Sequence, residues 1–547
     1  MPSSWKIRQT CAKSRFLQFV DLLKGKYLRA SALPYIVLSA SVLVMVYLSF
    51  GNSLSIDFGP IDDHEIFRFL GTDRKIIPFQ IPKILWQETE IGHWSEVARF
   101  RPIYYFLRVL ETATFENQAT YWYASRIIML SLTVSFLVFI VTESFVTASR
   151  VLRICAGITF AMFLLSLSAL SEITMRLGPS ETYLVLAFSI FLYSSVKILK
   201  DSSRRGYWYL NCLAAIIAIG TKESAVALIA PFIYVFIKQL KANRQIRLRT
   251  IIQALPIVVL AVLAVVGPMK SISTTGTDIY GSERSLSGSL SLVLSYFKSS
   301  STRENSVALI FIGICFVVYS YRRTEIDKNS RVVLFLAITL YFVLITEFVF
   351  YQGNFTELRY LLISQISSRI LVFLCLAMIF NTIFSTLTKF RTLFGLLVIT
   401  TFFISNNVFQ DYSKSRSSNI EIGIKNATLT NEYQNKIAEI EIALQSQRYS
   451  GIVIQLNSVW DYEPAYAISQ YAAFLGNGLP VSVNLIIGTV SPGIETILLE
   501  QLKGFQDDGS SEWNLKSKSQ SFQTKNLCIV FNEASAAEQK CFGVLPG

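Results

Sequence analysis

Eleven apolar stretches, separated by short polar segments, constrain the fold of this chain most strongly. Windows of roughly 15–25 apolar residues are long enough to cross the hydrocarbon core of a membrane as helices. The predicted spans are Leu33–Phe50, Tyr123–Val146, Val151–Leu170, Tyr183–Leu199, Tyr207–Ile219, Ser224–Ile237, Ile251–Val266, Val307–Tyr319, Val332–Phe350, Leu361–Phe384 and Thr392–Phe409. We therefore predict an α-helical polytopic membrane protein with about eleven transmembrane helices.

The composition agrees with a membrane protein and argues against nucleic-acid binding. Of the 547 residues, 52% are hydrophobic and only 16% are charged. A soluble protein of this length needs more charge to cover its surface. The net charge of +13 comes from short basic clusters between apolar stretches, which is typical of topology signals and not of a phosphate-binding face. We expect membrane lipids, and no nucleic acid, among the partners.

Basic residues precede the first span and recur in every second loop. They include Lys6 to Arg29, Arg150 and Arg153, Lys197 to Arg205, Lys238 to Arg249, Arg322 and Arg323, and Lys389 and Arg391. Because loops rich in Lys and Arg stay in the cytoplasm, the N-terminus is predicted to be cytoplasmic and the C-terminus external. We expect a multi-pass protein of the plasma (inner) membrane. Its first span is a retained anchor, since its apolar core exceeds that of a signal peptide.

Three units follow from this topology. Residues 1–31 form a cytoplasmic tail, residues 32–409 form the transmembrane module with a long first external loop at 51–120, and residues 410–547 form a periplasmic or extracellular domain. The last unit is predicted to be a small α/β domain, with strands at Gly451–Leu456, Val481–Ile487 and Leu527–Phe531 and helices at Asn431–Gln447, Tyr462–Leu475 and Gly493–Leu502. Cys528 and Cys541 are its only cysteines, and whether they pair stays open.

Four consecutive polar residues, Asp62, Asp63, His64 and Glu65, follow the first span by about a dozen residues. Gly59-Pro60 predicts a helix start, and Ile61–Leu70 continues as a short amphipathic segment. A carboxylate above an apolar stripe at the membrane interface is partly desolvated, which suits a general base. The alternative is simple capping of the helix, because acids are favourable in its first turn. Two consecutive Asp followed by His and Glu exceed what a cap needs.

Both histidines of the chain, His64 and His93, fall in this same loop. They indicate either a shared site or the exclusion of His from the spans. A divalent ion (Mg²⁺ or Mn²⁺) held by Asp62, Asp63 and a His is a weakly signalled alternative. We predict no certain cofactor and no metal ligands.

Cationic residues occur in the same external loops as the acids. Arg99 and Arg101 stand in the segment Arg99-Phe100-Arg101-Pro102, Lys222 and Glu223 lie in a later external loop, and Arg359 lies in the fifth. Ionisable groups near membrane depth are costly and tend to mark function. Arg and Lys on this face are suited to hold a phosphate or pyrophosphate.

The chain resembles the C-type membrane glycosyltransferases of the GT-C fold. The resemblance rests on the acidic pair Asp62-Asp63 soon after span one, the Arg99–Pro102 stretch, the many spans, the cytoplasmic N-terminus and the external C-terminal domain. It implies an enzyme, a hexosyl- or pentosyltransferase, that transfers a sugar from a polyprenyl-phosphate donor to a glycan, lipid or protein acceptor on the external face.

The resemblance implies a role for each of these residues. Inversion by single displacement is the simplest chemistry, with Asp62 or Asp63 as catalytic base and Asp62 slightly favoured. The substrate-binding residues would be His64, Glu65, Arg99, Arg101, Lys222, Glu223 and Arg359. A flippase or transporter of lipid-linked oligosaccharide and a polysaccharide polymerase are the alternatives.

Overall fold

The structure is a computed structural model. It describes residues 28–59, 63–71, 73–94, 99–145, 149–202, 205–242, 247–275, 328–351, 358–383, 391–405 and 407–445, four strands between 451 and 531, and residues 467 and 471.

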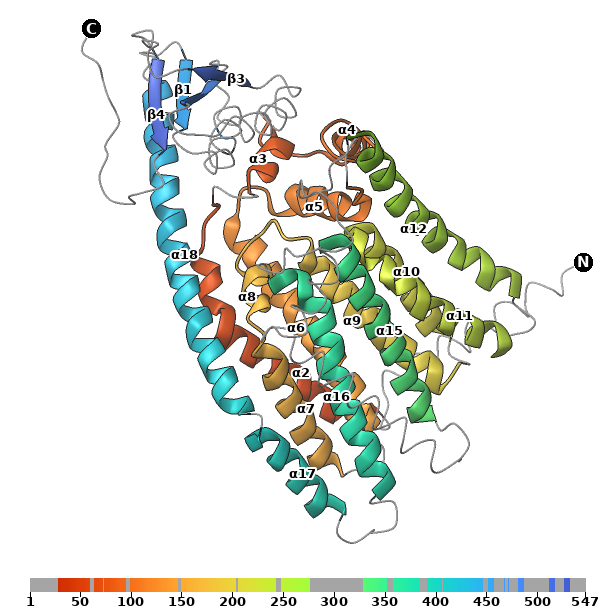
Figure 1. Ribbon diagram of the computed structural model, residues 1–547. Helices are drawn as coiled ribbons and strands as arrows, with labels where there is room; N and C mark the ends of the chain where they lie inside the picture. Colours follow the sequence, from red (N-terminus) through yellow and green to blue (C-terminus); the bar gives the residue numbers. More distant parts are fainter. Residues whose placement is uncertain are drawn as a thin grey trace, which may run out of the picture.

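Long helices make up the body of the molecule (Figure 1). They are α2 (Leu28–Phe50), α6 (Ala119–Ser144), α7 (Arg150–Leu165), α9 (Glu181–Lys200), α10 (Arg205–Thr221), α11 (Ile229–Ala242) with η3 (Glu223–Leu228), α12 (Arg247–Thr275), α15 (Lys328–Tyr351), α16 (Leu362–Ile383) and α17 (Arg391–Ser405). These helices match ten of the eleven predicted spans, and Val307–Tyr319 lies outside the described residues.

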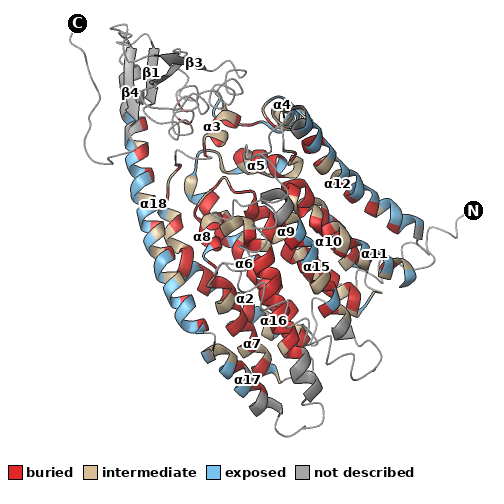
Figure 2. Cartoon of the chain, in the orientation of Figure 1, coloured by how far each residue is buried: buried red, intermediate tan, exposed pale blue. Residues whose placement is uncertain are grey.

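Six helical stretches in the described part of the chain are long and apolar enough to cross a membrane. They are Leu33–Ser55, Ala119–Ser144, Glu181–Lys200, Glu223–Lys241, Leu248–Lys270 and Leu358–Ala377. The protein is therefore a helical, polytopic membrane protein, and the count of eleven spans stays a prediction. Helix α9 packs against α6 and α10 and is buried along most of its length, whereas α12 leaves an apolar face exposed (Figure 2). An exposed apolar face is what a helix at the lipid boundary presents.

The loop after α2, which was predicted to be external, contains η1 (Gly51–Ser55), α3 (His64–Leu70), η2 (Pro78–Gln80), α4 (Ile81–Gln87) and α5 (Pro102–Phe115). The predicted amphipathic helix is found, with Ile66, Phe67, Phe69 and Leu70 buried. It begins at His64, later than the predicted start near Pro60, and Asp63 is its N-cap residue. Pro102 occupies the first turn of α5, where a missing N–H costs nothing.

One 38-residue helix, α18 (Val408–Gln445), contains the predicted helix Asn431–Gln447 except for its last two residues. It runs along α2 and α7 to a four-stranded parallel sheet (Figure 1). The sheet has the order β3-β2-β1-β4 and consists of β1 (Gly451–Leu456), β2 (Val481–Ile486), β3 (Ser511–Lys516) and β4 (Asn526–Phe531). Three of these strands fall where strands were predicted, and β3 was not predicted.

The remainder of the C-terminal region lies largely outside the described residues. This includes the predicted helix Gly493–Leu502, all but Ala467 and Tyr471 of the predicted helix Tyr462–Leu475, and Cys541. The α/β domain and the pairing of Cys528 with Cys541 therefore stay predictions.

Candidate active site

Asp63 lies buried at the start of α3, with 3% of its surface exposed. Its Oδ2 accepts a hydrogen bond from the backbone N–H of Gly59 at 2.7 Å, which connects the start of the helix to the end of the segment that follows η1. Asp62 lies outside the described residues. Of the acidic pair, the structure thus describes only one member, and that member is held in one orientation by the backbone.

Glu65 connects α3 to α5. Its Oε2 accepts from the phenol of Tyr104 at 3.3 Å and lies 3.8 Å from Nε of Arg108. Tyr104 also contacts the carbonyl of Gly178 at 2.9 Å, so it reaches the loop before α9. Burial, followed by the charge of Glu65, raises the pKa of Tyr104 well above its ordinary value. The phenol is therefore a hydrogen-bond donor at neutral pH.

Arg101 stands at the N-cap of α5 and is held by two acids. Its Nη2 lies 2.5 Å from Oε1 of Glu90, and its Nε lies 3.9 Å from Oε1 of Glu223. Nη2 also contacts the phenol of Tyr105 at 3.2 Å. Burial opposes its charge, but Glu90, Tyr105 and Glu223 outweigh this effect and raise the pKa of Arg101 well above its ordinary value. Arg101 is a permanent cation with the fork geometry that suits a phosphate.

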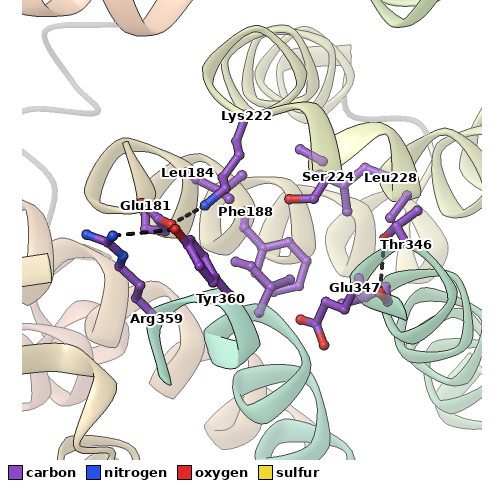
Figure 3. A pocket seen from close by; sticks show the side chains of 14 residues that line it. Glu181, Leu184, Phe188, Lys222, Ser224, Leu228, Thr346, Glu347, Arg359 and Tyr360 are labelled. Atoms are coloured by element: carbon purple, nitrogen blue, oxygen red, sulfur yellow. Dashed lines mark hydrogen bonds and ion pairs between the residues drawn. The ribbon is translucent and has the colours of Figure 1, made fainter. Parts of the chain in front are cut away.

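Lys222 and Arg359 meet at a buried carboxylate. Nζ of Lys222 forms an ion pair with Oε1 of Glu181, and the guanidinium of Arg359 points toward the same carboxylate (Figure 3). Both cations also lie over the ring of Tyr360, Lys222 at 4.4 Å and Arg359 at 5.2 Å from its centroid. Burial lowers the pKa of Lys222, although Glu181 acts in the opposite direction. Glu181 therefore favours the charged form of Lys222.

These contacts form three groups of ion pairs on four segments of the chain, which we together call the charge chain. Tyr104 links the first two groups, because its phenol bonds to Glu65 and its ring centroid lies 5.1 Å from Cζ of Arg101. Glu223 of the second group raises the pKa of Lys222 in the third. The members are the carboxylates Glu65, Glu90, Glu181 and Glu223 and the cations Arg101, Arg108, Lys222 and Arg359. Such a cluster, supplemented by neutral phenols, can bind an anionic group through Arg and Lys while nearby carboxylates accept protons.

Most of the predicted binding residues converge, and a few do not. Glu65, Arg101, Lys222, Glu223 and Arg359 belong to the charge chain just described. Arg99 is half-buried beside Phe100, and His64 sits in the first turn of α3. His93 is exposed in the turn after α4, and in the described part of the chain no three His, Cys, Asp or Glu side chains could hold a metal ion together.

Several residues of the site were not predicted. Glu90, Tyr104 and Tyr105 gave no signal, because single acids and tyrosines in a loop are common. Glu347 in α15 did carry a signal, since it is an acid inside an apolar stretch. It is 2% exposed, its Oε1 accepts from the N–H of Ser364 at 3.2 Å, and it lines the small pocket that Lys222 and Arg359 also line (Figure 3).

Solved structures that are similar to the chain include two of one protein, whereas no family model and no curated protein matches it. One is the crystal structure of ArnT from Cupriavidus metallidurans bound to undecaprenyl phosphate, at 15% identity and a TM-score of 0.42, covering 88% of this chain and 90% of that one. The other is the apo state of the same protein, at 15% identity and a TM-score of 0.37, covering 86% and 89%. Both likenesses are distant.

Proposed function

We propose that the protein is a membrane glycosyltransferase that moves a sugar from a polyprenyl-phosphate donor to a glycan, lipid or protein acceptor on the external face. The observation that carries this proposal is the charge chain, in which cations from separate segments gather at one end of a helical bundle. A lipid-linked anion needs this arrangement, because its tail stays in the bilayer while its phosphate requires cations at the membrane boundary.

The roles follow from the chemistry of the transfer. The acceptor oxygen attacks the anomeric carbon, its proton passes to Asp62 or Asp63, and the bond from the anomeric carbon to the phosphate oxygen breaks with inversion. Arg101, with Lys222 and Arg359, stabilises the polyprenyl phosphate as it leaves. The bond from Gly59 to Asp63 orients one carboxylate of the pair, which supports a defined position for the base.

The test uses purified protein in lipid nanodiscs and a panel of undecaprenyl-phosphate sugars. The measured quantity is undecaprenyl phosphate released in the presence of a cell-envelope acceptor fraction. We expect Asp62→Asn and Asp63→Asn to lower turnover by about 10²–10⁴-fold, because an amide cannot take the proton. Arg101→Met should weaken the binding of undecaprenyl phosphate itself.

The outcomes separate the candidate functions. A double Asp62→Asn, Asp63→Asn variant with near-normal turnover would remove the general-base role. Movement of intact donor across a liposome membrane, with no release of undecaprenyl phosphate, would replace the transferase by a flippase. Processive lengthening of a lipid-linked glycan would instead identify a polymerase.

A further inference from the structure

The segment before the acidic pair has no regular secondary structure, so its backbone groups need other partners. Residues 56–59 follow η1 and are neither helix nor strand. Phe58 N–H is satisfied locally by Oδ1 of Asp57 at 2.7 Å, and Gly59 N–H by Oδ2 of Asp63 at 2.7 Å. The backbone of Asp57 and Phe58 is also bound from a helix that is far away in the sequence.

That helix is α18, and it holds the segment from one face. The N–H of Asp57 donates to Oγ1 of Thr430 at 3.0 Å, and Nε2 of Gln434 donates to the carbonyl of Phe58 at 2.7 Å. Thr430 and Gln434 are four residues apart, so they lie one turn apart on the same face of α18. Together they fix the backbone next to Gly59, whose N–H binds Asp63.

An aromatic cluster secures the same contact. Nε2 of Gln434 also bonds to the phenol oxygen of Tyr471 at 2.9 Å. The ring of Tyr471 lies 3.9 Å from that of Phe67 in α3, and Phe67 lies 5.1 Å from Phe58, centroid to centroid. These three rings are each at most 4% exposed. The amide of Gln434 thus binds both the acidic segment, through Phe58, and Tyr471, which in turn packs against Phe67 of α3.

We infer that Gln434, assisted by Thr430, is a positioning residue for the acidic pair. The inference rests on the proposed transferase function. Gln434 binds the carbonyl of Phe58, and the N–H of the neighbouring Gly59 binds the carboxylate of Asp63. The position of the Asp63 carboxylate therefore depends on α18. The C-terminal region consequently takes part in catalysis by setting the geometry of the base, while the phosphate is bound elsewhere, at Arg101 and Lys222.

Two substitutions at Gln434 test this role. Gln434→Met removes both N–H donors, whereas Gln434→Lys keeps donors at a similar reach. We expect Gln434→Met to lower kcat about 10–100-fold, the loss that a misplacement of about 1 Å causes, with the Kd for undecaprenyl phosphate within about twofold of the wild type. Gln434→Lys should recover most of kcat. Thr430→Val should also lower kcat, but by less, and leave the Kd for undecaprenyl phosphate unchanged. Asn435→Leu on the exposed side of α18 should change neither kcat nor this Kd.

A readout without turnover separates this inference from the proposed function. Hydrogen–deuterium exchange of the peptide covering residues 56–70 should accelerate in Gln434→Met, because Asp57 and Gly59 lose their fixed geometry, and should stay slow in Asn435→Leu. Unchanged exchange, or a full kcat in Gln434→Met, overturns the positioning role. If exchange is faster in Gln434→Met but the wild type transfers no sugar from the panel, only the transferase proposal is overturned.

Discussion

The buried charges at Glu181 lead to a prediction about which single removal destabilises the protein most. Glu181 is the acid between two cations, with side chains of Glu181 and Lys222 only 5% and 9% exposed. Removing one member of a buried ion pair costs about 3–5 kcal/mol, because the other charge is left uncompensated. Removing the charge of Glu181 and removing the charge of Lys222 should cost different amounts of stability.

Glu181→Leu leaves Lys222 and Arg359 without the carboxylate that lies between them, so its cost should lie at the upper end, about 5 kcal/mol. Lys222→Met leaves Glu181 with Arg359 still pointing toward it, so its cost should lie near the lower end, about 3 kcal/mol. The double variant removes both charges of the pair. It should cost less than the sum of the two by about 3 kcal/mol, since contacting residues are not additive.

The assay is denaturant unfolding in mixed micelles, followed by tryptophan fluorescence, for both single variants and the double variant. Lys197→Met is the matched control. Lys197 pairs with Glu143 at 2.5 Å, but its side chain is 21% exposed, so its loss should cost about 1 kcal/mol or less. Equal costs for the two single variants, or an additive double variant, would refute the reasoning that Glu181 neutralises both cations.

Two further predictions concern orientation and pH. A cysteine replacing the exposed Lys83 of α4 should react with an impermeant maleimide added outside intact cells, and one replacing Lys197 should react only after permeabilisation; the reverse pattern contradicts the proposed topology. In Glu181→Gln, burial lowers the pKa of Lys222 without the opposing carboxylate, so Lys222 loses its proton at a lower pH than in the wild type. Binding of undecaprenyl phosphate should therefore fall at a lower pH in this variant, and identical pH profiles would contradict the role of Lys222.

The sequence by itself determined the helical membrane architecture and the end of the molecule where the polar residues gather. Apolar length is a local property, so it located ten helices. The local pattern Gly59-Pro60 predicted a start of α3 that is earlier than the observed one at His64. The reason is that the side chain of Asp63 accepts a hydrogen bond from the backbone N–H of Gly59, and helix propensity does not include such a bond.

Only the tertiary structure decided which polar residues act together. Lys222 pairs with Glu181, 41 residues away, and Gln434 binds the backbone of Phe58, 376 residues away. Such pairs depend on how helices pack, and a buried charge or backbone group must find a partner wherever the packing supplies one. The residue types and their loops were therefore predictable, whereas the partners of Arg101, Lys222 and the acidic segment came from the fold.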